Sequence, residues 1–251
     1  MINDLQQHVI NEFGSPLAQE FYTQKAEEGL WPSEKILIKK YFPTGAKILD
    51  LGCGTGRTTM PLFRMGHNVV GVDITPAMIE NAKKITQAHN LAIRFELGDA
   101  TRLTYPDNSF DGILFSNNGW TQIPRKEKRL KALQETYRVL KPGGVLIFTT
   151  HVRSMRHYFF FWIMQWIKLY VLKPLAFTID EIEFGDRFFD RETSGTRIHY
   201  RQKQFIHIPR VKDVQEHIAA AGFTLILTAS GNTISGLNRA HYSPMCYVCK
   251  K

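Results

Sequence analysis

The chain has 251 residues, of which 43% are hydrophobic and 22% charged, as in ordinary globular proteins. Eighteen glycines and 11 prolines exclude collagen-like and low-complexity architectures. Three cysteines are too few for a disulfide framework, and the first residues lack the basic and apolar segments of a secretory signal. We therefore expect a cytoplasmic protein.

The net charge of +9 is unevenly distributed. Residues 1–150 carry 18 Lys and Arg against 15 Asp and Glu, whereas residues 151–251 carry 14 against 8. A basic second half is compatible with binding to nucleic acid, an anionic membrane face or an anionic substrate. It is equally compatible with a solvated basic surface, because no run of five like charges occurs.

Helical patterns come first, and strands and helices then alternate. Up to residue 44 the chain is typical of helix and loop, with an apolar stripe through Ile36, Leu37 and Tyr41 that ends before Pro43. The pattern then predicts strands at 47–51, 68–73, 93–97, 110–115 and 145–149, and helices at 57–65, 76–89 and 125–140. Two further strands are predicted at 223–229 and 245–250. This alternation indicates a doubly wound α/β fold with a mostly parallel sheet.

Between residues 152 and 207 the alternation stops, over a stretch too long for an ordinary connection in an α/β sheet. We interpret it as a cap inserted after the fifth strand. The chain is then a single domain, with a helical cover at 1–44, a core at 45–150, a cap at 151–207, and a final helix and strands at 208–251.

A glycine-rich loop follows the first predicted strand. Closely spaced glycines let a backbone turn tightly and approach a ligand, which in open α/β sheets lies beyond the carboxyl ends of the strands. The spacing is G-x-G-x-G at Gly52, Gly54 and Gly56, and Arg57 occupies the position where a dinucleotide fingerprint needs glycine. Asp50 before the loop also suits an ammonium group better than a pyrophosphate. The pattern therefore disfavours NAD.

Two carboxylates follow later strands. Asp73 ends the second predicted strand, where a carboxylate can accept both hydroxyls of a ribose, or simply cap the next helix. Asp99 follows the third predicted strand and can accept a hydrogen bond from an adenine amine. Both residues are predicted to face the same ligand as the glycine loop.

Together these segments resemble the class I S-adenosylmethionine-dependent methyltransferases. The run ILDLGCGTG at 48–56 resembles motif I of that family, and Asp73, GDA at 98–100, SFD at 109–111 and LKPGG at 140–144 follow in the family's order. The resemblance covers about residues 45–150. It implies a seven-stranded sheet whose last strand, antiparallel, is 245–250.

The resemblance also implies site residues for S-adenosylmethionine and its product S-adenosylhomocysteine. The methionine moiety lies against Asp50 and the loop of Gly52, Cys53, Gly54 and Gly56, the ribose against Asp73, and the adenine against Asp99 and Ala100. Further lining is expected from Ile74, Met78 and Ser116, and from Tyr22 and Trp31 in a helical cover. Core packing is the alternative for Tyr22 and Trp31. No metal is expected.

Catalytic groups are less clearly indicated. S-adenosylmethionine is already an activated donor, so an obvious acid–base pair is not required. Ser116-Asn117-Asn118-Gly119-Trp120 follows the fourth strand but differs from the Asn/Asp-Pro-Pro-aromatic pattern of amino methylases. Asn117 there and His151 after the fifth strand are the two catalytic candidates. An ordinary turn and a structural histidine are the alternatives.

The cap contains an aromatic stretch at 158–172, YFFFWIMQWIKLYVL. It is shorter than the roughly 20 apolar residues of a spanning helix. Three interpretations remain: a lid that builds an apolar acceptor pocket, a helix in a membrane interface, or a helix that packs in a core or dimer.

The acceptor is predicted to be a small, apolar or aromatic-containing metabolite. The alternative is RNA, such as tRNA, supported by the strip of Arg191, Glu192, Arg197, His199, Tyr200, Arg201 and Lys203, although two exposed cap strands explain that strip equally. A further alternative is a non-catalytic binder of S-adenosylmethionine that serves a partner protein. Cys246 and Cys249 would face opposite sides of a strand, which excludes them as a metal pair.

Overall fold

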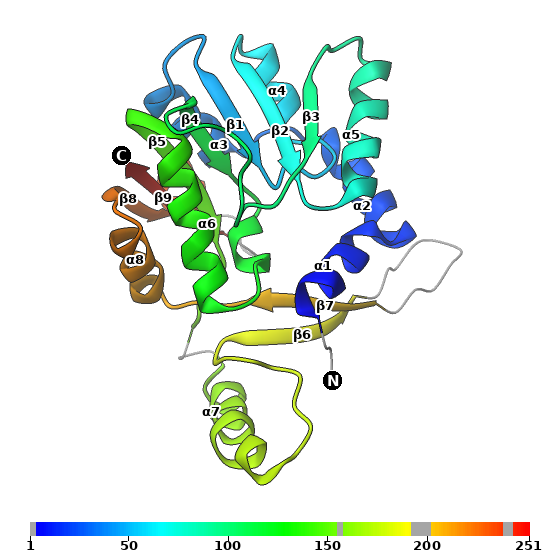
Figure 1. Cartoon of the computed structure of the whole chain (residues 1–251), viewed down its shortest axis with the longest axis vertical. Helices are drawn as coiled ribbons and strands as arrows, with labels where there is room; N and C mark the ends of the chain where they lie inside the picture. Colours follow the sequence, from blue (N-terminus) through cyan, green and yellow to red (C-terminus); the bar gives the residue numbers. More distant parts are fainter. Residues whose placement is uncertain (1–3, 155–157, 192–201, 238–242) are drawn as a thin grey trace.

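The computed structural model describes residues 4–154, 158–191, 202–237 and 243–251. Its centre is a seven-stranded sheet in the order β3-β2-β1-β4-β5-β9-β8 (Figure 1). The strands are β1 (Lys47–Leu51), β2 (Asn68–Asp73), β3 (Arg94–Leu97), β4 (Phe110–Phe115), β5 (Leu140–Thr150), β8 (Thr224–Ser230) and β9 (Met245–Lys250). The prediction of a doubly wound seven-stranded sheet is confirmed.

Strand direction also follows the prediction. β1 pairs in parallel with β2 and β4, β2 with β3, and β4 with β5. β9 runs antiparallel to both β5 and β8, so the last strand of the chain lies between them. The carboxyl ends of the parallel strands therefore meet at one edge of the sheet, beside which α1 lies (Figure 1).

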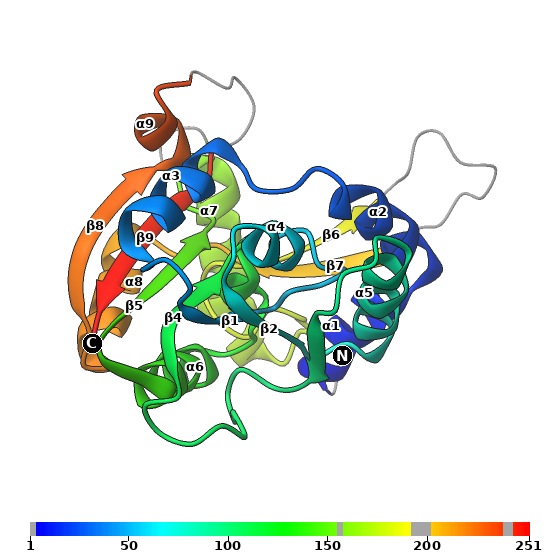
Figure 2. The same cartoon turned by 90° about the horizontal axis from the view of Figure 1, so that it is seen from above.

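Helices cover both faces of the sheet because strand side chains alternate between the faces. On one face, α3 (Pro32–Tyr41) and α4 (Thr59–Arg64) pack on Ile48, Leu114 and Ile147. On the other, α6 (Lys126–Val139) and α8 (Val211–Ala220) pack on Leu49 and Phe148. α5 (Pro76–Ala88) covers the β2–β3 end, and α9 (Gly231–Ser235) follows β8 (Figure 2).

Two helices precede α3 and cover the carboxyl edge of the sheet. α1 (Leu5–Gly14) begins at Asp4, whose carboxylate accepts hydrogen bonds from two backbone amides of the first turn. α2 (Pro16–Ala26) begins at Ser15 and carries proline at its first position. Thr55 of the glycine loop donates a 2.6 Å hydrogen bond to the Tyr22 carbonyl, which holds α2 against the loop.

The segment after β5 leaves the main sheet. It forms α7 (Phe159–Ile167), a π-helical turn η2 (Lys168–Leu172), a 3-10 turn η3 (Lys173–Leu175), and the antiparallel hairpin of β6 (Asp186–Arg191) and β7 (Gln202–His207). The hairpin crosses below the carboxyl edge of the main sheet, and α7 projects beyond it (Figure 1). The boundaries of a separate cap unit stay a prediction. Among the described residues, no helix is long and apolar enough to cross a membrane.

Candidate functional site

A cavity with about 1170 Å³ of space, including its open mouth, lies at the carboxyl ends of β1, β2 and β4. The loops after these strands and after β3 supply most of its wall, and α1, α2, α5 and the 3-10 helix η1 (Gly119–Gln122) also contribute. This is where open α/β sheets bind their ligands. Its exposed lining is mainly apolar, with a few polar groups that converge on it.

The glycine loop presents bare backbone to the cavity. Gly54 lines the cavity at φ +53°, and a Cβ added there would meet no atom within 4 Å. Gly52, at φ +65°, is different, because its Cβ would come within 2.9 Å of the Phe115 ring. Gly52 therefore allows the strand and the turn to pack closely, whereas Gly54 leaves space that a ligand can occupy.

Asp73 lies at the end of β2 and points at the glycine loop. Its carboxylate accepts hydrogen bonds from the backbone N–H of Gly54 at 2.9 Å and of Thr75 at 2.8 Å. Burial raises the pKa of this carboxyl above its ordinary value. Asp73 also lines the cavity, so its carboxylate oxygens are placed to accept hydroxyl protons from a ligand.

Asp99 follows β3 at another part of the wall. One oxygen accepts hydrogen bonds from the backbone and hydroxyl of Thr101. The other accepts a 2.7 Å bond from the side-chain amide of Gln6 on α1, and the Gln6 carbonyl oxygen accepts one from Lys128. The N-terminal helix is thus linked to the carboxylate that the resemblance assigns to the adenine.

Asp50 lies beneath the loop and does not line the cavity. One of its carboxylate oxygens accepts hydrogen bonds from the Thr58 and Thr59 hydroxyls, at 2.7 and 2.5 Å. Burial raises the pKa of Asp50 to about 6 despite those hydrogen bonds. In this structure Asp50 therefore holds the start of α4 against the loop.

A buried ion pair adjoins the same wall. The guanidinium of Arg57 lies 2.8 and 2.9 Å from the two carboxylate oxygens of Glu34, and it also donates to the Gly29 carbonyl and to Ser116. The Ser116 hydroxyl donates to Glu34. Arg57 also stacks over the Trp31 ring, 4.5 Å from the ring centroid. Burial by itself lowers the pKa of Arg57, but the apposed Glu34 carboxylate raises this pKa above its ordinary value, so the guanidinium stays charged.

The structure brings most of the expected residues to one cavity. Those that line it are Tyr22, Gly52, Cys53, Gly54, Asp73, Ile74, Met78, Asp99, Ala100, Ser116 and Asn117. The expected residues outside its lining are Trp31, Asp50, Gly56 and His151. Burial raises the pKa of the Cys53 thiol well above its ordinary value, so this residue stays a protonated thiol at neutral pH.

His151 follows β5 but is not part of the cavity wall. Burial lowers the pKa of its imidazole to about 4, so the ring is neutral at physiological pH. Among the described residues no histidine lines the cavity. The two expected catalytic candidates thus differ in placement: Asn117 lies at the wall and His151 does not.

Several lining residues were not expected from the sequence. Gln6, Val9 and Phe13 come from α1, and Gln122, Ile123 and Pro124 from η1 and the turn after it; Lys25 of α2 also contributes. The only sequence signal of Val9 and Phe13 is an apolar helical spacing, which core packing explains as well, and the polar members of the set have no signal. Glu34 and Arg57 are 23 residues apart in the chain, and nothing in the sequence except their opposite charges indicated that they would pair.

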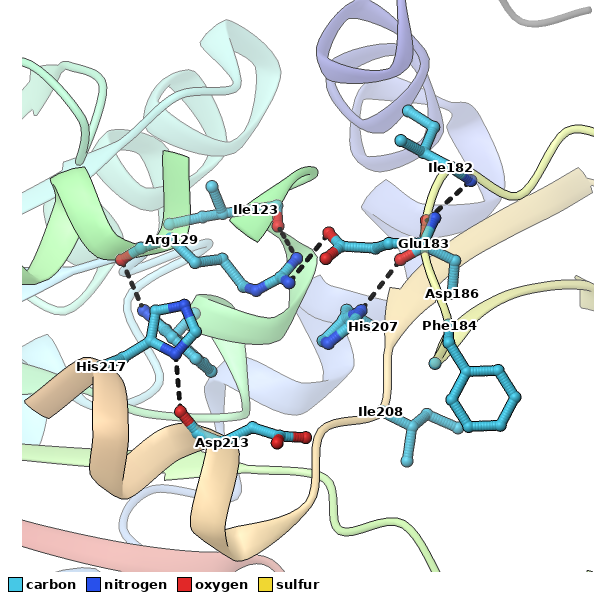
Figure 3. A network of polar contacts seen from close by, with 12 residues as sticks. Ile123, Arg129, Ile182, Glu183, Phe184, Asp186, His207, Ile208, Asp213 and His217 are labelled. Carbon is cyan, nitrogen blue, oxygen red and sulfur yellow. Dashed lines mark hydrogen bonds and ion pairs between the residues drawn. The ribbon is translucent and has the colours of Figure 1, made fainter. Parts of the chain in front are cut away.

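A second polar network holds the β6–β7 hairpin against η1 and α6 (Figure 3). Arg129, fully buried on α6, donates to Glu183 at 2.9 Å and to the Ile123 carbonyl at 3.1 Å. His207 on β7 lies 2.9 Å from a carboxylate oxygen of Asp186 on β6. Glu183, Asp186 and His207 resemble a metal-binding set in spacing, but Arg129 already neutralises Glu183, and backbone amides and His207 occupy Asp186.

The cap residues expected to form a basic strip lie largely outside the described residues. Glu192, Arg197, His199, Tyr200 and Arg201 are not described, and neither is the side chain of Arg191. Lys203 on β7 forms an ion pair with Asp180 and lies 4.9 Å from the centroid of the Phe188 ring. The described part of the strip is a two-stranded hairpin, as the alternative interpretation expected.

Residues 48–144 match a family model described as a methyltransferase domain. The chain is 33% identical over 152 residues to a demethylmenaquinone methyltransferase of Symbiobacterium thermophilum, covering 55% of this chain and 57% of that protein. It is 35% identical over 130 residues to phosphoethanolamine N-methyltransferase 3 of Arabidopsis thaliana, covering 50% of this chain and 25% of that one. The matches thus span little more than half, or less, of these relatives.

The fold is shared with a solved S-adenosylmethionine-dependent methyltransferase from Methanosarcina mazei. The TM-score is 0.67 at 21% identity, over 89% of this chain and 98% of that one. The cavity also fits the cofactor of this family, because Gly54 leaves open space and two carboxylates face it. Residues 48–144 thus match a methyltransferase domain, and the chain has the fold of the S-adenosylmethionine-dependent methyltransferases.

Proposed function

We propose that the protein transfers the methyl group of S-adenosylmethionine to a small, apolar or aromatic-containing metabolite and releases S-adenosylhomocysteine. The observation that carries this proposal is the make-up of the cavity. A glycine loop and two carboxylates suited to the cofactor share one wall with apolar side chains from Val9, Phe13 and Phe115.

In this proposal the cofactor lies along the loops after β1, β2 and β3. Asp73 accepts the ribose hydroxyls, and Asp99 and Ala100 hold the adenine. Ile74 and Met78 pack on the adenosine, and Tyr22 covers it from α2. The backbone of Gly52, Cys53 and Gly54 borders the methionine moiety. Arg57, which lines the cavity, offers a positive charge to its carboxylate group.

The bound cofactor supplies a methyl group that is already activated on a sulfonium. The chain's contribution is to hold an acceptor in line with that methyl group and to exclude water, and orientation of this kind lowers a barrier by about 7–11 kcal/mol. Ser116, Asn117 and Gln122 are neutral hydrogen-bonding groups on the wall. They can orient an acceptor but cannot accept its proton as a base at neutral pH.

An acceptor that carries its own nucleophile suits this wall. A phenol, enol or thiol ionises readily enough to need little base catalysis, whereas an aliphatic hydroxyl needs a positioned base. The names of the two relatives include one apolar aromatic acceptor, demethylmenaquinone, and one polar acceptor, phosphoethanolamine. The exposed lining is mainly apolar, which favours the first kind, because burying a charged phosphate there costs its desolvation.

The test is transfer of a labelled methyl group from S-adenosylmethionine into a lysate of the source cell, separated into organic-extractable, nucleic-acid and protein fractions. Asp73→Ala serves as the control with an impaired cofactor site. We expect label in the organic fraction with the wild-type protein only.

Label in the nucleic-acid fraction would overturn the proposed acceptor class in favour of RNA. Absence of label above the control, combined with tight binding of S-adenosylhomocysteine in a titration, would overturn the enzyme proposal in favour of a non-catalytic binder.

A further inference from the structure

Exposed apolar side chains gather on one part of the molecule. Among the described residues, sixteen large hydrophobic side chains are exposed, and eleven of them lie between residues 158 and 177. We call these eleven the aromatic surface: Tyr158, Phe159, Phe160, Phe161, Ile163, Met164, Trp166, Tyr170, Val171, Leu175 and Phe177. Exposed patches of this kind mark interaction sites.

The aromatic surface is not the outer face of an ordinary amphipathic helix. Trp162, Gln165 and Leu169, spaced three and four residues apart, form the buried stripe of α7 and η2. Gln165 bonds to the backbone of Asp186 and Gly185, and Trp162 packs on Phe184. A helix on a globular protein normally turns charged and polar residues outward. Here every exposed residue of α7 is apolar.

The surface does not belong to the cavity already described. No described residue of α7, η2 or η3 lines that cavity, so the aromatic stretch is not its lid in this structure. α7 lies on the far side of the β6–β7 hairpin, at one end of the long axis, and projects away from the sheet (Figure 1).

The charges around the surface select the partner. Residues 158–179 contain no acidic residue, and their two charged residues, Lys168 and Lys173, are both exposed. Of the acidic residues that follow, Asp180 pairs with Lys203 and Glu183 with Arg129, while Glu181 is half-buried. Arg187 lies 5.3 Å from the centroid of the Phe161 ring at the edge of the surface. Tyr158, Trp166 and Tyr170 combine an apolar body with a polar tip, as residues at membrane interfaces do.

We propose that the aromatic surface inserts into the interface of a membrane that contains anionic lipids. A second copy of the chain is a poorer partner, because symmetric pairing would bring Lys168 and Lys173 of two protomers toward like charges. An anionic bilayer instead attracts those lysines while it takes up the aromatic rings. This proposal does not depend on the function proposed above, because membrane binding requires neither methyl donor nor acceptor.

The test is co-flotation of the full chain, without cofactor, with vesicles of neutral phosphatidylcholine or of phosphatidylcholine mixed with phosphatidylglycerol. We expect binding to the mixed vesicles, weakened by salt. Phe160→Gln and Trp166→Gln should each lower the partition coefficient roughly tenfold. Ile226→Gln, which changes an apolar residue on β8 that is nearly as exposed as Trp166, should leave it unchanged.

A second set of variants tests whether the lysines contribute to binding of anionic lipid. Lys168→Gln and Lys173→Gln should each weaken binding to the mixed vesicles about fivefold, and Lys35→Gln on α3 should not. Brominated lipid should quench fluorescence in the wild type, and Trp166→Phe should remove most of that quenching. An unchanged thermal midpoint of each variant shows that folding is intact.

Three outcomes would overturn the proposal. One is the absence of flotation with both kinds of vesicle. Another is equal loss of binding in Phe160→Gln and Ile226→Gln. The last is a concentration-dependent dimer in sedimentation equilibrium that Phe160→Gln abolishes, since that result would assign the surface to a second copy.

Discussion

At the scale of single residues, position decides what a carboxylate can do. Asp50 is the next-to-last residue of β1 and Asp73 the last of β2, both next to the glycine loop, and burial raises the pKa of both. Asp50 bonds to two threonine hydroxyls below the loop, whereas Asp73 bonds to backbone amides and lines the cavity. The same residue type therefore stabilises the loop in one place and faces a ligand in the other.

Replacing Asp73 by asparagine should weaken cofactor binding. The substitution retains size but replaces one acceptor oxygen with a donor, so it loses a hydrogen bond to the ribose and the bond from the Gly54 amide. We expect the dissociation constant for S-adenosylhomocysteine to rise by about 10- to 100-fold, as losing a charge-assisted hydrogen bond implies. Isothermal titration measures it. An unchanged constant would contradict the assignment of Asp73 to the ribose.

His151 should make stability depend on pH. Its folded pKa of about 4 lies below the ordinary histidine value, so the unfolded chain binds the proton more readily. Its contribution is complete above about pH 6.5 and is lost as the pH falls toward 4, by at most about 3 kcal/mol. Urea unfolding of His151→Gln should show a shallower loss of stability over this range than the wild type.

Asp50 should change stability with pH in the opposite direction to His151, and it therefore serves as a control. Its folded pKa of about 6 lies above the ordinary aspartate value, so its effect lowers stability as the pH rises from about 4 to 6. Asp50→Asn should remove that decline. If both variants change the pH profile in the same direction, the environments described here for these two groups are wrong.

At the scale of elements, the glycine loop both packs against the core and borders the cavity. Gly52 approaches the Phe115 ring, while Gly54 borders open space in the cavity. Both have positive φ, which disfavours any residue with a Cβ atom. Only Gly52 also lacks space for that atom inside the fold. The two positions therefore separate stability from binding.

Alanine at these two glycines should give different defects. Gly52→Ala adds a clash with Phe115 to the backbone strain and should lower the free energy of unfolding by about 2–4 kcal/mol. Gly54→Ala should cost only about 1 kcal/mol in stability but weaken cofactor binding at least tenfold. Denaturation and titration of each variant measure both quantities. Equal stability losses would show that the loop has no room at Gly54.

At the scale of the whole molecule, buried charge connects the β6–β7 hairpin to the core. Arg129 is fully buried, and its guanidinium lies 5.7 Å from the centroid of the Trp120 ring, while Glu183 faces it from the segment before β6. Trp120 and Gln122 belong to η1, and Gln122 lines the cavity. The hairpin is therefore held beside a wall of the candidate site.

Removing Glu183 alone should be costly. Glu183→Gln leaves the Arg129 charge buried without a counter-charge, and we expect a loss of about 3–5 kcal/mol in unfolding free energy. Arg129→Met with Glu183→Gln removes the charge as well and should recover part of that loss. Urea denaturation of the single and double variants gives the coupling between them. Additive losses would contradict a coupled pair.

Local patterns in the sequence were enough for the sheet. The strand at 47–51 and the one at 68–73 were predicted at their observed bounds, because apolar runs bordered by glycine and charge are short-range signals. Cys246 and Cys249 on β9 face opposite sides, each within a different core cluster, as the two-residue period of a strand requires. β5 is longer than predicted, since its Pro142-Gly143-Gly144 segment lies within the strand.

The sequence alone thus determined the fold family and the carboxylates and glycines on the loops after β1, β2 and β3, since their spacing and order are local properties of the chain. Only the tertiary structure decided that α1 and η1 complete the cavity, that Glu34 pairs with Arg57, and that the aromatic surface turns outward. Such contacts join residues distant in the chain. An apolar helical stripe indicates burial but does not say which neighbour, if any, will cover it.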